Sequence, residues 1–102
     1  MFYKEDIESD IAVSDFTVSI TDTTSSYQLI LWNDDVNSFD WVITTLMEVC
    51  GHTEDQAEQC AMIIHFKGKY GVKNGDYDTL KPMCNTVNDR GINATIELLI
   101  EQ

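Results

Sequence analysis

The sequence predicts an α+β domain in which a small three-stranded antiparallel sheet packs against three helices, in the order β-α-α-β-α-β. Short apolar runs with strand character open and close the folded part of the chain, and three longer segments repeat apolar residues at the three- and four-residue spacing of a helix face. Two helical segments separate the first strand from the second. A small sheet with its helices on one face is therefore the natural arrangement.

The chain divides at residue 26. Residues 1–26 are rich in Ser, Thr and Asp in their second half, and apolar residues between Ile11 and Ile20 recur with a period near two. We expect this acidic block to be a flexible N-terminal extension with at most a transient strand. Residues 27–102 are expected to form the folded domain.

Residues 27–32 are expected to form the first strand, and the first helix is expected to begin after it. Asn37 is the expected N-cap, with Asp40 placed to reach back to it, and Gly51 ends the helix. The buried stripe of this helix comprises Val42, Ile43, Leu46, Val49 and Cys50.

A second helix is expected to begin after Thr53, which forms a capping box with Gln56. The inward face of this helix comprises Ala57, Cys60, Ala61 and Ile64. His65 lies beside that face, near the end of the helix. Gly68 and Gly71 then bracket a turn and a short strand over residues 69–72.

Asn74-Gly75 predicts a turn before the third helix. That helix begins at Thr79 or at Asp76 and ends at Gly91. Because Pro82 lacks an N–H, it belongs in the first turn of the helix or kinks it. The buried face comprises Leu80, Met83, Cys84 and Val87, and residues 94–100 are expected to form the third strand.

The charge of the chain excludes several classes of partner. The net charge is −12, from 18 acidic and 6 basic residues. Such a protein is poorly suited to bind nucleic acid or an anionic membrane surface, whereas a basic partner or a cationic ligand is compatible with it. The charge could also serve solubility alone. There is no apolar run of about 20 residues and no secretory pattern, and three cysteines favour free thiols in a reducing cytoplasm.

The candidate site lies where the first strand gives way to the first helix. Trp32-Asn33-Asp34-Asp35 ends the strand, and His65 follows about thirty residues later in the second helix. Amide and carboxylate oxygens that converge at a rigid corner are suited to capture a small cation. By themselves, these residues could equally be a turn cluster and a histidine at the edge of the core.

The two motifs together resemble the ClpS family, small adaptors of the bacterial Clp protease that deliver N-end-rule substrates. The match comprises the strand, Asn33-Asp34-Asp35, and the helix end His65-Phe66-Lys67-Gly68-Lys69, and the resemblance covers about residues 27–100. It implies a cytoplasmic adaptor, expected to be a monomer, without catalysis, cofactor or metal. Such an adaptor would bind N-degron substrates that begin with Leu, Phe, Tyr or Trp and deliver them to the Clp AAA+ unfoldase.

The chemistry of the residues is compatible with that role. A free N-terminus is a cation with a pKa near 8, and it offers three N–H donors. Asn33, Asp35 and a neutral His65 are suitable acceptors, and Asp34 adds negative potential. By resemblance, Asn33 also contacts the first peptide group.

The resemblance also implies an apolar pocket and a docking surface. The implied pocket residues are Phe39, Val42, Ala61, Ile64 and Ala94. Phe39 and Ala61 stand where Met is frequent, and Ala94 where Leu is frequent, so we expect a pocket that accepts bulky aromatic residues. Asp76 and Lys81 match positions that dock on the unfoldase N-domain, although both could simply be a solvated helix end. The extension matches the region that the family needs for hand-over.

Three other interpretations of the sequence remain open. Cys50, His52 and Cys60, with His65, could bind a metal, but they lack the paired spacing of structural zinc sites. A hydrolase that uses Cys60 or Cys84 with His65 is disfavoured because both thiols lie on apolar faces. A docking domain without degron binding, similar to the C-terminal domain of the ribosomal stalk protein, would have no need of both Asn33 and His65.

Overall fold

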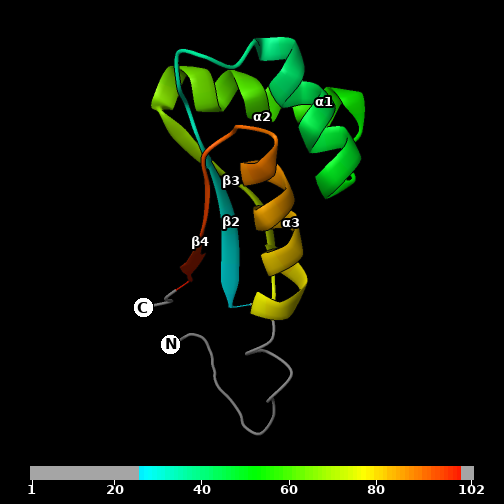
Figure 1. The fold of residues 1–102 in the computed structure, drawn as a ribbon, viewed down its shortest axis with the longest axis vertical. Helices are drawn as coiled ribbons and strands as arrows, with labels where there is room; N and C mark the ends of the chain where they lie inside the picture. Colours follow the sequence, from blue (N-terminus) through cyan, green and yellow to red (C-terminus); the bar gives the residue numbers. More distant parts are fainter. Residues whose placement is uncertain (1–25, 100–102) are drawn as a thin grey trace, which may run out of the picture.

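The computed structural model describes residues 26–99, so nearly all of the expected N-terminal extension lies outside the described residues. The elements are β2 (Tyr27–Trp32), α1 (Phe39–Cys50), α2 (Glu54–Lys67), β3 (Lys69–Gly75), α3 (Tyr77–Asp89) and β4 (Ala94–Leu98) (Figure 1). This order confirms the predicted fold. No helix between residues 26 and 99 is long and apolar enough to cross a membrane.

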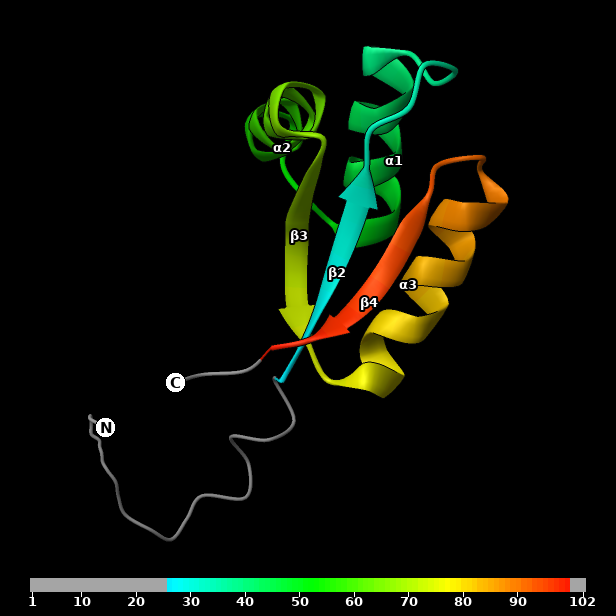
Figure 2. The same cartoon turned by 90° about the vertical axis from the view of Figure 1, so that its left-hand side faces the viewer.

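The sheet places β2 between β3 and β4, and both pairings are antiparallel. Figure 2 shows the three strands side by side with α1 and α3 behind them, so these two helices lie on the same face of the sheet. On that face, Leu29 and Leu31 of β2 are completely buried in a core that they share with Leu46 of α1 and Leu80 of α3. Burial of each such side chain contributes roughly 1.5–3 kcal/mol. The buried central strand therefore provides a rigid support for the loop that follows it.

The first helix begins one residue later than the cap prediction requires. Ser38, not Asn37, is the N-cap, and its hydroxyl accepts a hydrogen bond from the Trp41 N–H. The expected cap failed because the Asn37 side chain is engaged elsewhere, with Asp34 and the Gly91 carbonyl. The predicted end of α1 and the predicted cap of α2 are confirmed. Gly51 ends α1 in the left-handed conformation, and Thr53 and Gln56 form the capping box of α2.

The second strand is longer than predicted. Asn74-Gly75 is not a turn, because both residues belong to β3 and pair with Gln28 and Tyr27 of β2. Gly71 also lies within the strand, opposite Ile30. The register shifts there, so that Val72 is an extra residue in β3. The fourth strand ends at Leu98, short of the predicted residue 100, which lies outside the described residues.

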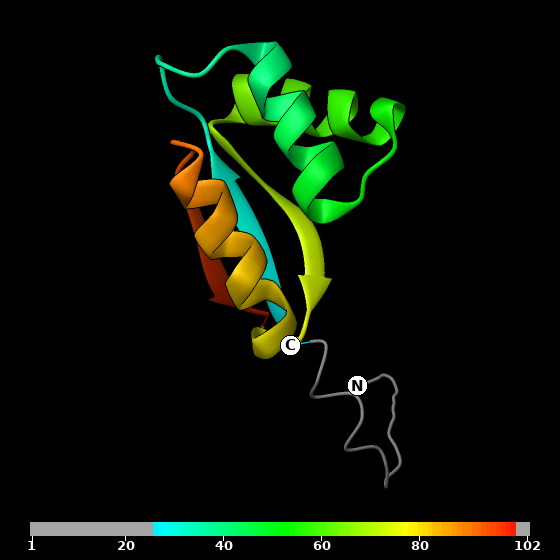
Figure 3. The ribbon, with the colours of Figure 1, turned by 45° about the vertical axis from the view of Figure 1, so that its right-hand side comes forward.

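The third helix begins at Asp76, the earlier of the two predicted starts. The Asp76 carboxylate accepts a hydrogen bond from the Thr79 N–H at 3.0 Å. Pro82 consequently lies inside the helix, beyond its first turn, where it cannot donate to the carbonyl of Asp78. Figure 3 shows α3 lying across the sheet, below α1 and α2.

Candidate functional site

Backbone hydrogen bonds join the end of β2 to the end of α2. The Asn33 N–H donates to the carbonyl of Gly68 at 2.9 Å. Gly68 ends α2 with a φ of 92°, and its own N–H donates to Ile64 at 2.9 Å. His65 lies in that last turn of α2. The contact therefore brings Asn33 and His65 to the same corner, although about thirty residues separate them in the chain.

This corner contains a cavity of about 450 Å³, within the range of sites that bind small molecules. Its polar lining comes from the loop after β2 and from His65, and its apolar lining comes from α1 and α2. The lining residues are Asn33, Asp34, Asp35, Asn37, Ser38, Phe39, Val42, Ala61, Ile64 and His65. The structure thus joins a polar rim to an apolar wall in one cavity.

The cavity gathers every predicted rim residue and all but one of the predicted pocket residues. Ala94 is the exception, because it lies in the core at 4% exposure, paired with Leu31. Its carbonyl accepts hydrogen bonds from the side chains of Asn88 and Cys84. Asn37 and Ser38 line the cavity but were expected only as part of the helix start. Ile92 lines a much smaller cavity, about 20 Å³, which shares Asn37 and Val42 with the first.

Asp34 organises the loop. Its carboxylate accepts hydrogen bonds from the N–H groups of Val36 at 2.9 Å and Asn37 at 2.8 Å, and from the Asn37 side chain at 2.8 Å. These bonds, the Asn37 N–H foremost, lower the pKa of Asp34 below its ordinary value. The turn-cluster interpretation is therefore correct for Asp34. It can still add negative potential to the cavity that it lines.

The other rim residues keep their acceptor atoms for a ligand. Within residues 26–99, none of the hydrogen bonds uses the side chains of Asn33, Asp35 or His65. All three residues are exposed and line the cavity. The ring of His65 is held against Phe66 in an edge-to-face contact, with 5.2 Å between the ring centroids. An amide, a carboxylate and an imidazole are thus available at one rim.

The two predicted docking residues lie far from this cavity, at the start of α3. Asp76 caps the helix, and hydrogen bonding to Thr79 lowers the pKa of its carboxyl group. The Lys81 ammonium lies 5.9 Å from the centroid of the Tyr77 ring. In Figure 1, α3 begins at the lower end of the sheet, whereas the loop after β2 lies at the upper end. Any function of Asp76 and Lys81 is therefore spatially separate from the cavity.

The thiol groups are poorly suited to nucleophilic chemistry or metal binding. Burial raises the pKa of Cys50 to about 11, and it also raises the pKa of Cys60 and Cys84. The Nε2 atom of His52 is occupied by a contact of 2.9 Å with the Val72 carbonyl. Between residues 26 and 99, no group of three or more His, Cys, Asp or Glu residues could hold a metal ion.

Comparison with known proteins yields consistent matches. A sequence model of the family described as "ATP-dependent Clp protease adaptor protein ClpS" matches residues 22–98. The ClpS adapter protein of Corynebacterium aurimucosum is 27% identical over 93 residues, which cover 91% of this chain and 77% of the relative. The ClpS adapter protein of a Synechococcus species is 32% identical over 72 residues, covering 70% and 69%.

A solved structure, that of Agrobacterium tumefaciens ClpS2 bound to L-phenylalaninamide, has a similar fold. Its TM-score is 0.70 at 23% identity, and the likeness covers 74% of this chain and 98% of that chain. The part of this chain that the family model matches, residues 22–98, includes the cavity and every described element from β2 to β4.

Proposed function

Because the chain belongs to the ClpS family of adaptors of the ATP-dependent Clp protease, we propose that its cavity binds the N-terminus of N-degron substrates for delivery to the Clp AAA+ unfoldase. One observation supports this proposal above the others. Acceptors from Asn33, Asp35 and His65 line the same cavity as the apolar side chains of α1 and α2. An α-amino group and the first side chain are attached to the same carbon atom, so a site that binds both needs this combination.

The rim is suited to the ammonium group. A free N-terminus is positively charged at neutral pH and has three N–H donors. Asn33, Asp35 and a neutral His65 offer an amide oxygen, a carboxylate and a ring nitrogen as acceptors. Asp34 contributes negative potential through a carboxylate whose lowered pKa keeps it ionised. We assign these four residues to recognition of the α-amino group.

The apolar wall is suited to a bulky first residue. Ala61 and Ile64 are buried beside the cavity, and Phe39 is partly exposed at it. Because Ala61 is small, it leaves room for a large side chain, and we propose Leu, Phe, Tyr and Trp as first residues. L-phenylalaninamide, the ligand of the Agrobacterium relative, combines a free amino group with an aromatic side chain. Ala94 has no part in this wall.

The size of the pocket can be tested separately. Ala61→Met fills part of the cavity, so we expect it to weaken binding of a Trp-initiated peptide more than that of a Leu-initiated peptide. Fluorescence anisotropy with both peptides measures the ratio of the two affinities. Equal ratios for wild type and Ala61→Met would contradict a specificity set by the space at Ala61.

We further propose that the protein is a non-catalytic monomer of the cytoplasm whose residues Asp76 and Lys81 dock on the N-domain of the unfoldase. Their place at the start of α3 leaves the cavity accessible to substrate during docking. An alternative is a docking domain of the same fold that binds no degron. The commitment of the Asp34 carboxylate to the loop favours this alternative, since a turn cluster needs no ligand.

Binding of a Phe-initiated peptide and of its N-acetylated copy distinguishes the two functions. Acetylation removes the positive charge, so it should abolish binding to a degron site. We expect His65→Ala to weaken binding of the free peptide by about tenfold, the cost of a lost charge-assisted hydrogen bond. His52→Ala is the matched control, because His52 does not line the cavity. Equal binding of free and acetylated peptides would exclude degron recognition.

A further inference from the structure

The turn after α3 contacts the loop that forms the rim of the cavity. At Gly91, where φ is 90°, the carbonyl accepts a hydrogen bond from the Asn37 side chain at 2.9 Å. The same Asn37 nitrogen donates to the Asp34 carboxylate at 2.8 Å. Asn37 therefore bridges the turn and the loop, two segments 54 residues apart in the chain.

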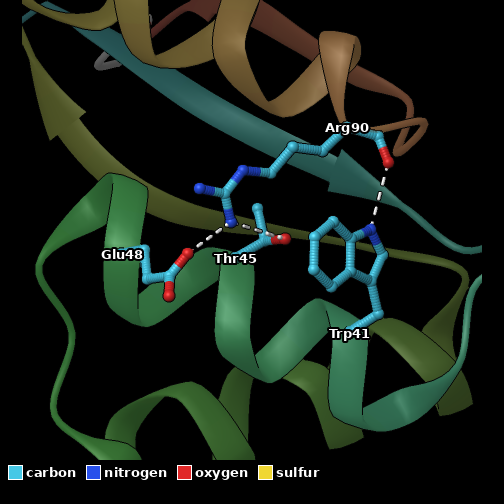
Figure 4. Close-up of polar contacts among 4 residues, drawn as sticks. All are labelled: Trp41, Thr45, Glu48 and Arg90. Carbon is cyan, nitrogen blue, oxygen red and sulfur yellow. Dashed lines mark hydrogen bonds and ion pairs between the residues drawn. The ribbon is translucent and has the colours of Figure 1, made fainter.

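The neighbouring residue of that turn secures α1. Figure 4 shows the Arg90 side chain extending along the helix, where Nη1 lies 2.9 Å from Glu48 Oε1 and donates to the Thr45 hydroxyl at 3.5 Å. The Arg90 carbonyl accepts a hydrogen bond from the Trp41 indole at 3.0 Å, and the guanidinium lies 5.4 Å from the centroid of the Trp41 ring. These contacts hold α1 against the end of α3.

Both halves of the cavity are thus held by two consecutive residues. The loop supplies the polar rim, and α1 supplies Phe39 and Val42 of the apolar wall. In a ligand whose ammonium group and side chain are attached to the same carbon atom, the distance between these two groups is limited. Such a ligand can contact the rim and the wall together only if these two parts of the cavity are held at a fixed separation. A small displacement of the loop relative to α1 would favour one contact at the expense of the other.

We propose that Asn37 is a positioning residue for recognition of the substrate's N-terminus. It holds the polar rim in place relative to the apolar wall on α1, and Arg90 secures that helix. This inference rests on the proposed function of the cavity. Asn37 acts through Asp34 and Gly91, and the ammonium acceptors remain Asn33, Asp35 and His65.

The test compares Asn37→Ala with Asn85→Ala, an exposed asparagine of α3 that does not line the cavity. We expect Asn37→Ala to bind a Phe-initiated peptide about five- to tenfold more weakly, the effect of losing well-placed hydrogen bonds, and Asn85→Ala to bind like wild type. Circular dichroism confirms that each variant is folded. If wild type distinguishes the free peptide from the acetylated one and Asn37→Ala binds as tightly, only this inference fails. If wild type does not distinguish them, the proposed function fails as well.

Asn37→Asp gives a second readout, one that a purely structural role would not change. This substitution places a carboxylate against the Asp34 carboxylate and the Gly91 carbonyl. The other titratable groups that line the cavity are Asp35 and His65. The nearby Arg90 side chain is paired with Glu48 instead. We expect weak binding near neutral pH. Relative to wild type, the affinity should recover as the pH falls to about 5, because a protonated side chain donates again. A relative affinity independent of pH would overturn the proposal.

Discussion

The two aspartates that follow Asn33 have different surroundings despite being adjacent. Asp34 accepts three hydrogen bonds from Val36 and Asn37 and so fixes the conformation of the loop. Asp35 is exposed and lines the cavity without a hydrogen bond from the described part of the chain. One carboxylate therefore builds the rim, and the other is available to a ligand.

The role of Asp34 makes a prediction about acid stability. Hydrogen bonding, above all from the Asn37 N–H, lowers its pKa in the folded protein below the ordinary value for an aspartate, so the ionised form favours folding. This stabilisation is fully present above the unfolded pKa and is lost as the pH falls through the lower folded pKa. We expect the difference in unfolding free energy between wild type and Asp34→Asn to be constant at neutral pH and to shrink below 3.8. Urea denaturation at each pH measures it, with Asp35→Asn as control, and a difference that persists in acid would contradict the assignment.

At the level of single residues, the sequence predicted which residues line the rim better than which residues hold them in place. Asn33 and His65 are recognisable because each belongs to a short local motif. Ala94 was wrongly assigned to the pocket because its position depends on pairing with Leu31, which directs it into the core. Asn37 was mistaken for a helix cap because its partner Gly91 is distant in the chain, and no local pattern reveals that contact.

The ends of α1 and α2 have the same geometry but different surroundings. Both helices end at a glycine in the left-handed conformation, Gly51 with φ 76° and Gly68 with φ 92°. Neither position has an atom within 4 Å of an added Cβ. Only Gly68 accepts a hydrogen bond from Asn33, so only the end of α2 is connected to the cavity rim.

Substitution of these two glycines can distinguish an effect on stability from an effect on binding. Gly51→Ala and Gly68→Ala should each lower the free energy of unfolding by about 1 kcal/mol, because alanine is strained at positive φ. We expect only Gly68→Ala to weaken binding of a Phe-initiated peptide, since it alone displaces the carbonyl that holds Asn33. Thermal melts and anisotropy titrations of both variants provide the comparison. Similar binding losses in the two would mean that the effect is simply loss of folded protein.

At the level of elements, the sequence predicted correctly the helix cap and the helix end that depend on interactions between neighbours in the chain. The capping box at Thr53 and the end of α1 at Gly51 involve neighbours in sequence, and both predictions are confirmed. Asn74-Gly75 has the composition of a turn, but pairing with β2 extends the strand through it. Pro82 lies inside α3 rather than in its first turn because the helix is capped by Asp76 and not by Thr79. Long-range pairing and competition between caps are what the local sequence does not reveal.

At the scale of the whole molecule, α3 connects two separate regions. Its first residues are the proposed docking surface, and its last turn leads to Arg90 and Gly91, which hold the cavity. The sheet behind it extends between the same two ends (Figure 1). The helix therefore provides a direct structural connection between the proposed unfoldase contact and the proposed degron site.

The net charge of −12 leads to a final prediction, about salt. Self-repulsion in an acidic protein destabilises the compact state, and added salt screens it, so the melting temperature should rise with ionic strength. The same screening weakens the attraction between the acidic rim and a positively charged chain terminus. We expect the affinity for a Phe-initiated peptide without other charges to fall on the order of twofold between about 0.05 M and 0.3 M salt. Melts and titrations in NaCl and in KCl measure both effects and exclude binding of a specific ion. If stability and affinity changed in the same direction, the peptide would be held mainly by its side chain, and the electrostatic role of the rim would be wrong.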